Sequence, residues 1–260
     1  MEDMNKIHPE AKIGKGVNVG YFSVIEEDVI IGDGCEIGHN VTILKGSRLG
    51  DNCKVFPGAV IGAIPQDLKF AGEYTTVEVG NNTIIRECVT INRGTADRMK
   101  TVVGNNCLLM AYVHIAHDVI VGDNCIIANQ ASVAGHVIID DNVIIEGGAV
   151  GIQQFIHIGR HAFISGGSKV RKNVPPFIKV GRDPLAYVGV NSVGLKRRGF
   201  EDNDIRSIED IYRLIFVQNA NIGKGVEQVK ENLPLSDFRE EIIAFIDNSD
   251  KGVIKGLVKK

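Results

Sequence analysis

An aliphatic residue recurs at every sixth position along most of this chain. From Ile7, each step of six reaches another Ile, Val or Leu as far as Ile61, and the same phase resumes at Val79. After Ile145 one extra residue shifts the phase, which then continues to Val170. A period of six fits neither the 3.6 residues of a helical turn nor a free alternating strand. It predicts three short strands per turn of a parallel solenoid, in which each sixth residue points inward.

The other positions of the six-residue repeat favour the same fold. The residue four places after each anchor is mostly small or β-branched, and Gly, Asn and Asp cluster where corners would lie. Four of the five cysteines, Cys35, Cys53, Cys107 and Cys125, occupy the small inward position, so we expect them to be buried packing residues. The pattern resembles the hexapeptide repeats of left-handed parallel β-helices, which predicts a mainly β protein of that class.

The repeats are interrupted twice and end well before the C-terminus. Segments 65–78 and 96–102 break the phase and are expected to project as loops, which often form the binding surface of a solenoid. The phase is lost near Pro175, and helical spacing of apolar residues then begins, with Asp202 or Asn203 as the expected N-cap.

The predicted division of the chain is a β-helix over residues 1–190 and a helical domain over 191–260. A second apolar helical stripe follows Ser236. We expect this domain to cap the open end of the solenoid.

Composition excludes several classes of protein. The 260 residues carry a formal net charge of −3, which gives no electrostatic footprint for nucleic acid. Apolar runs long enough for a membrane span or a signal peptide are absent from the sequence, which predicts a protein that is neither exported nor membrane-spanning. An odd number of cysteines without a CxxC pair indicates free thiols in a reducing cytoplasm.

Three histidines are close together in the predicted solenoid. One coil has 18 residues, so His117 and His136, one coil plus one residue apart, are expected on adjacent coils near the same edge, with His114 close by. Asp118 and Gly135 are their neighbours in sequence. The remaining histidines of the repeats, His39, His157 and His161, are expected to be surface residues.

Two chemistries could use this cluster. In the first, a histidine is the general base for a substrate hydroxyl, Asp118 orients the imidazole, and a backbone N–H stabilises the oxyanion of an acyl transfer. In the second, three histidines bind a metal ion and activate water, as in a γ-class carbonic anhydrase. A third possibility is a non-catalytic solenoid scaffold. Sequence spacing alone does not separate them.

Several longer segments resemble those of one enzyme family. They are His114-Ile115-Ala116-His117-Asp118, Ala134-Gly135-His136-Val137, Gly194-Leu195-Lys196-Arg197-Arg198-Gly199-Phe200, Gln66-Asp67-Leu68-Lys69, Ala71-Gly72-Glu73 and Arg93-Gly94-Thr95. Taken together, in the order in which they occur along the chain, they resemble segments of the UDP-N-acetylglucosamine O-acyltransferases of lipid A synthesis. The resemblance extends over nearly the whole chain. The resemblance implies a homotrimer with active sites between subunits and with no cofactor or metal. It also implies a reaction that moves a 3-hydroxyacyl chain from acyl carrier protein to the 3-hydroxyl of UDP-N-acetylglucosamine.

The same resemblance assigns roles to individual residues. It implies that His117 is the general base, that Asp118 orients it, and that the backbone N–H of Gly135 binds the oxyanion. The substrate-binding residues that it implies are Asp67, Lys69, His114, His136, Gln154, Asn191, Arg197 and Arg198. Gly166 matches the position that limits acyl-chain length, and its missing side chain implies a deeper groove and a long chain. The chain departs from the family pattern at Gln153, Val193 and Asn92, where His, Glu and His are usual. Candidate docking residues for the acidic carrier protein are Arg171, Lys172, Lys179 and Lys196.

Overall fold

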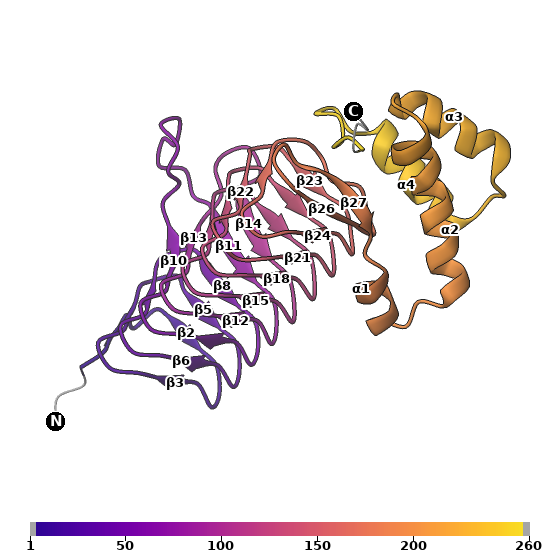
Figure 1. The fold of residues 1–260 in the computed structure, drawn as a ribbon. Helices are drawn as coiled ribbons and strands as arrows, with labels where there is room; N and C mark the ends of the chain where they lie inside the picture. The colour runs from indigo at the N-terminus through magenta and orange to yellow at the C-terminus, as the bar shows by residue number, and fades with distance from the viewer. Residues whose placement is uncertain (1–3, 257–260) are drawn as a thin grey trace.

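The computed structural model describes residues 4–256, which form a parallel β-helix followed by a group of helices (Figure 1). Three sheets, parallel except for the last strand pair β26–β27, make the three faces of a left-handed prism, here named faces A, B and C. Face A contains β1 (Lys6–Ile7), β4 (Val24–Ile25), β7 (Thr42–Ile43), β10 (Val60–Ala63), β13 (Thr90–Asn92), β16 (His114–Ile115), β19 (Ser132–Val133), β22 (Gly151–Ile152) and β25 (Lys169–Val170). Face B contains β2 (Lys12–Ile13), β5 (Ile30–Ile31), β8 (Ser47–Leu49), β11 (Thr76–Val79), β14 (Lys100–Val103), β17 (Ile120–Val121), β20 (Ile138–Ile139) and β23 (His157–Ile158). Face C contains β3 (Asn18–Val19), β6 (Glu36–Ile37), β9 (Lys54–Val55), β12 (Ile84–Ile85), β15 (Leu108–Leu109), β18 (Ile126–Ile127), β21 (Ile144–Ile145), β24 (Phe163–Ile164), β26 (Ile178–Gly181) and β27 (Ala186–Val190).

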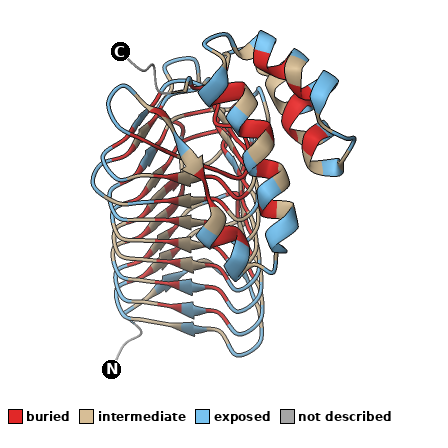
Figure 2. Cartoon of the chain, turned by 45° about the vertical axis from the view of Figure 1, so that its right-hand side comes forward, coloured by how far each residue is buried: buried red, intermediate tan, exposed pale blue. Residues whose placement is uncertain are grey.

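The sixth-residue anchors stack in register inside the prism. On face A, Ile25, Ile43 and Ile61 are paired on consecutive coils and are at most 1% exposed. Figure 2 shows this buried interior running up the β-helix from its second coil, whereas Ile7 and Ile13 of the first coil are exposed. Burial of each such side chain stabilises the fold by about 1.5–3 kcal/mol. The four cysteines at the small inward position are buried as predicted.

Left-handed backbone conformations at the corners turn the chain from one face to the next. Between faces B and C this position holds Asn52, Asn106 and Asn124, which adopt positive φ at low cost. Between faces A and B, near the middle of the helix, it holds Asp118, with φ of 59°, and His136, with φ of 62°. This conformation costs most residues about 1–2 kcal/mol, so it is more costly for His136 than for Asn or Asp.

The two interruptions are shorter than the sequence predicted. β11 begins at Thr76 and β14 at Lys100, so each resumes pairing inside a segment expected to be a loop. The first interruption projects from the prism between β10 and β11 (Figure 1). We call residues 64–75 the arm.

Five helical segments follow the last strands. They are α1 (Ser192–Arg197), α2 (Asp202–Tyr212), the π-helical turn η1 (Arg213–Gln218), α3 (Ile222–Asn232) and α4 (Asp237–Asp247). The predicted N-cap of α2, Asp202 or Asn203, was wrong by one or two residues, because Glu201 caps the helix in a capping box with Asp204. Ser236 caps α4, and its side chain accepts the Arg239 N–H.

The helices cover the last coil of the solenoid. The buried Tyr212 hydroxyl of α2 donates to the Pro176 carbonyl at 2.7 Å. Arg160, at the corner after β23, makes a two-pronged ion pair with Glu241 of α4, with both N···O distances 2.6 Å. β26 and β27 form an antiparallel hairpin that the six-residue pattern did not predict. Within residues 4–256, the helices are all too short or too polar to span a bilayer.

Candidate active site

A pocket of ≈490 Å³ opens on face A beside the A/B corner. Of the predicted site residues, it is lined by His114, His117, Gly135 and Gln154. Gln66, from the start of the arm, closes one side of the same pocket.

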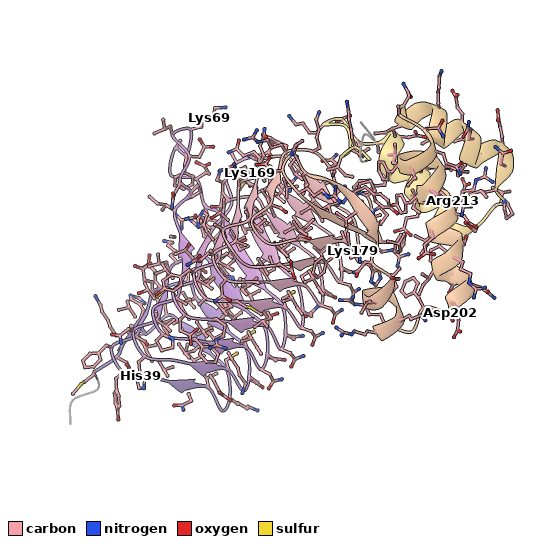
Figure 3. All side chains as sticks on the ribbon, viewed as in Figure 1. His39, Lys69, Lys169, Lys179, Asp202 and Arg213 are labelled. Carbon is pink, nitrogen blue, oxygen red and sulfur yellow. The ribbon has the colours of Figure 1, made fainter. Side chains whose placement is uncertain are left out.

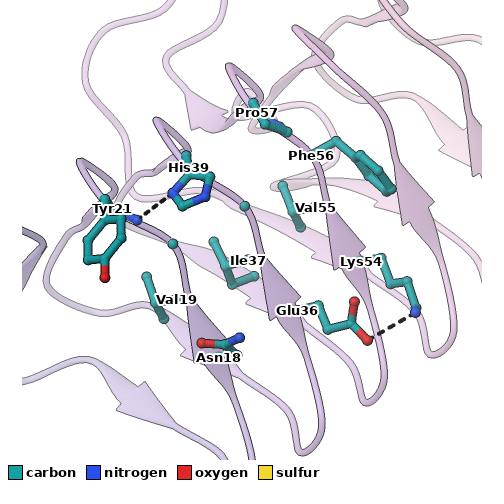
Figure 4. Close-up of a pocket in the computed structure, with 12 residues that line it drawn as sticks. Asn18, Val19, Tyr21, Glu36, Ile37, His39, Lys54, Val55, Phe56 and Pro57 are labelled. Carbon is teal, nitrogen blue, oxygen red and sulfur yellow. Dashed lines mark hydrogen bonds and ion pairs between the residues drawn. The ribbon is translucent and has the colours of Figure 1, made fainter.

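A larger pocket, ≈570 Å³, lies on the outer side of face C near the N-terminal coils (Figure 4). There, His39 Nδ1 accepts the Tyr21 N–H at 2.8 Å, and Lys54 pairs with Glu36 at 3.0 Å. None of the predicted catalytic or substrate-binding residues lines it. We therefore take the face A pocket as the candidate active site.

The contact between His117 and Asp118 that the sequence predicted is formed and buried. His117 Nδ1 lies 2.8 Å from Asp118 Oδ2, and both side chains are at most 4% exposed. A carboxylate only accepts hydrogen bonds, so this contact places the imidazole proton on Nδ1 and leaves Nε2 as a proton acceptor.

Asp118 is held by several hydrogen bonds besides the one to His117. Thr95 donates to it twice, from its N–H at 3.0 Å and from its hydroxyl at 2.7 Å, and the Arg98 N–H adds a bond of 3.2 Å. The hydroxyl of Thr101 accepts the Asp118 N–H at 2.9 Å. Burial alone would raise the pKa of Asp118, but the bonds from Thr95, His117 and Arg98 outweigh it and hold the pKa below its ordinary value. The carboxylate is therefore ionised beside His117.

Gly135 lies directly against the other edge of the imidazole. A Cβ at this position would come within 2.6 Å of His117 Cε1 and 2.7 Å of Nε2. Only glycine allows its backbone to approach the proton-accepting nitrogen this closely.

His136 extends the cluster by one coil. Its ring meets that of His117 edge-on, with centroids 5.1 Å apart, and stacks on Phe155 at 4.5 Å. Asp97 Oδ2 lies 3.0 Å from its Nδ1, at an angle that forms no hydrogen bond, and Asp118 Oδ2 lies 3.9 Å from its Nε2. His136 thus lies between the carboxylates of Asp97 and Asp118 at the A/B corner.

The same residues are the best candidates for a metal site in the part of the chain that is described. Ligand atoms of His117, Asp118 and His136 lie within 4.8 Å of one another. However, Asp118 Oδ2 already accepts bonds from His117 Nδ1 and the Thr95 hydroxyl. A cation would have to displace these donors, so the arrangement fits a hydrogen-bonded base better than a metal centre.

His114 lines the pocket on the face A side. Its Nδ1 lies 2.7 Å from the Thr90 hydroxyl on the preceding coil. Burial lowers the pKa of His114, and nearby His117 lowers it further, so its imidazole is neutral at neutral pH.

The predicted residues of the arm lie outside this pocket. Lys69 stands at the tip of the arm, away from the prism (Figure 3), and Asp67 accepts its backbone N–H at 2.9 Å.

Asn191, Arg197 and Arg198 also lie away from His117, near the B/C corner. Arg198 Nε donates to Asn142, just before β21, at 3.1 Å. The Asn191 side chain caps α1 and donates to the His161 carbonyl at 3.0 Å. One chain therefore does not bring these residues to the pocket that holds His117.

Sequence reasoning missed some residues and misplaced another. Thr95 donates to the Asp118 carboxylate and Thr101 accepts the Asp118 backbone N–H, and neither role was predicted. The sequence signals for Thr95 were its place in the Arg93-Gly94-Thr95 segment and beside the second interruption. His161 is not a surface residue as predicted. It is 5% exposed and stacks on Phe177, because the helical segments cover its corner.

Comparison with known proteins reveals the family. Residues 173–254 match the family described as Udp N-acetylglucosamine O-acyltransferase, domain 2, and residues 10–45, 28–63 and 100–135 match bacterial transferase hexapeptide repeats. A curated relative from Sulfurihydrogenibium sp. (strain YO3AOP1), named as an O-acyltransferase of acyl-acyl-carrier-protein and UDP-N-acetylglucosamine, is 48% identical over 257 residues. The match covers 96% of this chain and 94% of the relative. The chain belongs to the UDP-N-acetylglucosamine O-acyltransferase family.

Solved members of the UDP-N-acetylglucosamine O-acyltransferase family share the whole architecture. The enzyme from Bacteroides fragilis 9343 superposes with a TM-score of 0.94 at 48% identity, covering 98% of this chain and all of that one. The structure from Acinetobacter baumannii gives 0.92 at 37% identity, covering 98% of this chain and 99% of the other. The family resemblance and the left-handed β-helix predicted from the sequence are confirmed.

Two of the three residues that depart from the O-acyltransferase family pattern, Asn92 and Gln153, have contacts or positions that bear on the site. Asn92 is buried and donates to the Ile64 carbonyl at 2.7 Å, which fixes the start of the arm. Gln153 lines the candidate pocket. Val193 is an exposed residue of α1, and nothing in the structure explains its departure from the family pattern.

Proposed function

We propose that this protein transfers a 3-hydroxyacyl chain from acyl carrier protein to the 3-hydroxyl of UDP-N-acetylglucosamine, the first step of lipid A biosynthesis. The observation that carries the proposal is the buried His117–Asp118 pair, which faces a pocket beside the Gly135 backbone. Relatives at 45–48% identity are named for acyl-acyl carrier protein and UDP-N-acetylglucosamine.

The first chemical step is removal of a proton from the sugar. His117 Nε2 accepts the proton of the 3-hydroxyl as that oxygen attacks the thioester carbonyl. Asp118 keeps the other ring proton on Nδ1 and stabilises the imidazolium as it forms.

The second step collapses the tetrahedral intermediate. Its oxyanion is bound by the Gly135 N–H, for which residues 4–256 provide no acceptor. The C–S bond then breaks, and the departing thiolate of the carrier's phosphopantetheine takes the proton from His117. The activated thioester and the imidazole supply all that the reaction needs, so the proposal includes no cofactor and no metal.

Polar side chains around the pair suit a sugar nucleotide. His114 and Gln154 line the pocket and can hydrogen-bond the sugar. Lys169 and Arg171 line its far end, where their charges suit a phosphate or an acidic carrier protein. We include His136, Asp67 and Lys69 among the substrate contacts as the family resemblance implies.

The proposed active enzyme is a homotrimer with sites between subunits. Asn191, Arg197 and Arg198 are remote from His117 in one chain, so a neighbouring subunit has to supply them. The outer side of face C carries a row of half-buried aliphatic residues, Ile84, Leu108, Ile126 and Ile144. We propose that face C of one subunit packs on face A of the next, a head-to-tail contact that closes into a ring.

Gly166 is the proposed limit on acyl-chain length. It lies at the corner between faces C and A, where it packs so closely on the preceding coil that a Cβ would meet the Gly147 carbonyl oxygen at 2.6 Å. We propose, as the family resemblance implies, that the missing side chain leaves room for a long acyl chain. The free cysteines fit a reducing compartment, and we place the reaction in the cytoplasm.

A direct assay tests this proposal. Purified protein is incubated with UDP-N-acetylglucosamine and a panel of 3-hydroxyacyl carrier-protein thioesters, and products are identified by mass spectrometry. The proposal predicts one O-acylated sugar nucleotide, with the highest rate for a long-chain donor. Absence of product with every donor would contradict it.

A further inference from the structure

The carboxylate of Glu73 joins the two interruptions of the β-helix. Glu73 lies on the returning limb of the arm, and its two oxygens accept different backbone N–H groups. Oε2 accepts from Ala71, within the arm, at 2.9 Å, and Oε1 accepts from Ala96, in the second interruption, at 3.0 Å. The second bond spans 23 residues of sequence.

The carboxylate is held in its charged form. Its own N–H, and those of Ala71 and Ala96, lower the pKa of Glu73 below its ordinary value. It therefore accepts both bonds at neutral pH, and such charge-assisted bonds are stronger than neutral ones.

Ala96 follows Thr95, the residue that binds the catalytic carboxylate most extensively. Thr95 donates to Asp118 through both its N–H and its hydroxyl, and Asp118 in turn binds His117. One side chain thus connects the arm to the turn that holds the catalytic pair.

Other contacts of the arm are made at different places. Asn92 holds the Ile64 carbonyl at the start of the arm, and the Tyr74 hydroxyl donates to Asp28 at 2.7 Å at its end. Arg93 lies over the Phe70 ring at 5.6 Å. These contacts secure the base and the middle of the arm, whereas the Glu73 carboxylate reaches the turn beside Asp118.

We infer that Glu73 is a positioning residue. It holds the arm at a fixed position relative to the catalytic pair, so that Gln66, Asp67 and Lys69 contact the sugar nucleotide. This inference rests on the proposed function. Its specific consequence is that loss of the carboxylate weakens sugar-nucleotide binding and leaves the proton transfer at His117 intact.

The first test is kinetic and compares Glu73→Gln and Glu73→Ala with the wild type. Gln keeps one acceptor oxygen and Ala keeps none, so we expect KM for UDP-N-acetylglucosamine to rise in that order, by roughly 10- to 100-fold in Glu73→Ala. We expect kcat and KM for the acyl donor to change less than about threefold. Glu78→Gln is the matched control, because Glu78 pairs with Lys100 on the outer side of face B, away from the site.

The second test needs no activity. Trypsin cleavage after Lys69, followed by mass spectrometry, reports how often the arm opens. We expect cleavage there to be faster in both Glu73 variants than in the wild type and in Glu78→Gln.

The outcomes distinguish the two claims. A wild type without turnover would overturn the proposed function, while the cleavage rates would still show whether Glu73 fastens the arm. An active wild type with an unchanged KM in Glu73→Ala would overturn the positioning role. Equal cleavage rates in all variants would show that Glu73 does not hold the arm.

Discussion

Asp118 Oδ2 lies 2.8 Å from His117 Nδ1 inside a corner of the β-helix where both side chains are almost fully buried. Burial opposes the charge on Asp118, and hydrogen bonds from Thr95, His117 and Arg98 keep it ionised. A buried carboxylate with this many donors fixes both the orientation and the tautomer of the imidazole.

Replacing Asp118 by Asn should reduce kcat strongly while the protein remains folded. The amide would direct an N–H group toward at least one of the present donors, which disfavours the tautomer with a free Nε2. We expect kcat to fall roughly 10²- to 10⁴-fold, as measured by steady-state kinetics. The control is Asp140→Asn, which changes another carboxylate 3.0 Å from a histidine, His157, outside the pocket. Equal effects of the two substitutions would argue against a special role for Asp118.

Adding one methyl group at Gly135 should displace the catalytic imidazole. The new Cβ would meet His117 Cε1 at 2.6 Å, so the ring or the backbone has to move. A displacement of about 1 Å at the reacting atoms costs on the order of 100-fold in rate, which is the expected loss of kcat in Gly135→Ala. Gly151→Ala lines the same pocket but meets nothing within 4 Å, and should lose far less. The reverse order of the two rates would contradict the geometry.

Folding stability should depend on pH through His161. Burial, with nearby Arg160 and Arg198, lowers the pKa of His161 to about 4, below its ordinary value of 6.5. Between these values the unfolded chain binds a proton that the folded chain does not, so stability is complete above pH 6.5 and falls as the pH drops toward 4. At pH 5 the loss from this group is about 2 kcal/mol.

A variant without the titrating ring tests this pH dependence. His161→Asn introduces a residue that tolerates the φ of 59° at this position. Asn124 and Asn142 adopt a similar φ at the same corner of other coils. Urea unfolding at pH 8 and pH 5 should show a smaller difference in this variant than in the wild type. The same change at exposed His39 should leave the wild-type difference in place. An unchanged difference in His161→Asn would contradict the assignment.

Mixed trimers test whether the active site is shared between subunits. His117→Ala and Arg197→Ala should each lack most activity alone. If each site takes His117 from one subunit and Arg197 from the next, unfolding and reassembling an equal mixture should restore about a quarter of the sites. Activity that never exceeds that of the separate variants would place both residues in one subunit's site.

Much of the fold was predictable because the six-residue period acts locally and repeats. Ile25, Ile43 and Ile61 point inward for the same reason on each coil, so a pattern of aliphatic residues determines the register as well as the fold. The β26–β27 hairpin and the Glu201 cap were not predicted, because each occurs once and depends on local pairing that no repeat reports.

The contact between His117 and Asp118 was predictable, but the contacts that support it were not. His117 and Asp118 are neighbours in sequence and belong to a recognisable motif. Thr95 and Glu73 act through contacts across 23 residues of sequence each, made by loops that interrupt the repeat. His161 was misassigned because the helices that bury it lie outside the solenoid, where the coil-by-coil argument does not apply.

The central claim is that His117 is the base of an acyl transfer to a sugar nucleotide. Its most direct test is the single-turnover rate of O-acyl-UDP-N-acetylglucosamine formation by wild type and His117→Ala, with saturating long-chain 3-hydroxyacyl carrier protein. The account predicts a loss of roughly 10²- to 10⁴-fold in the variant, with folding and sugar-nucleotide binding retained. A variant that forms product at the wild-type rate would contradict it.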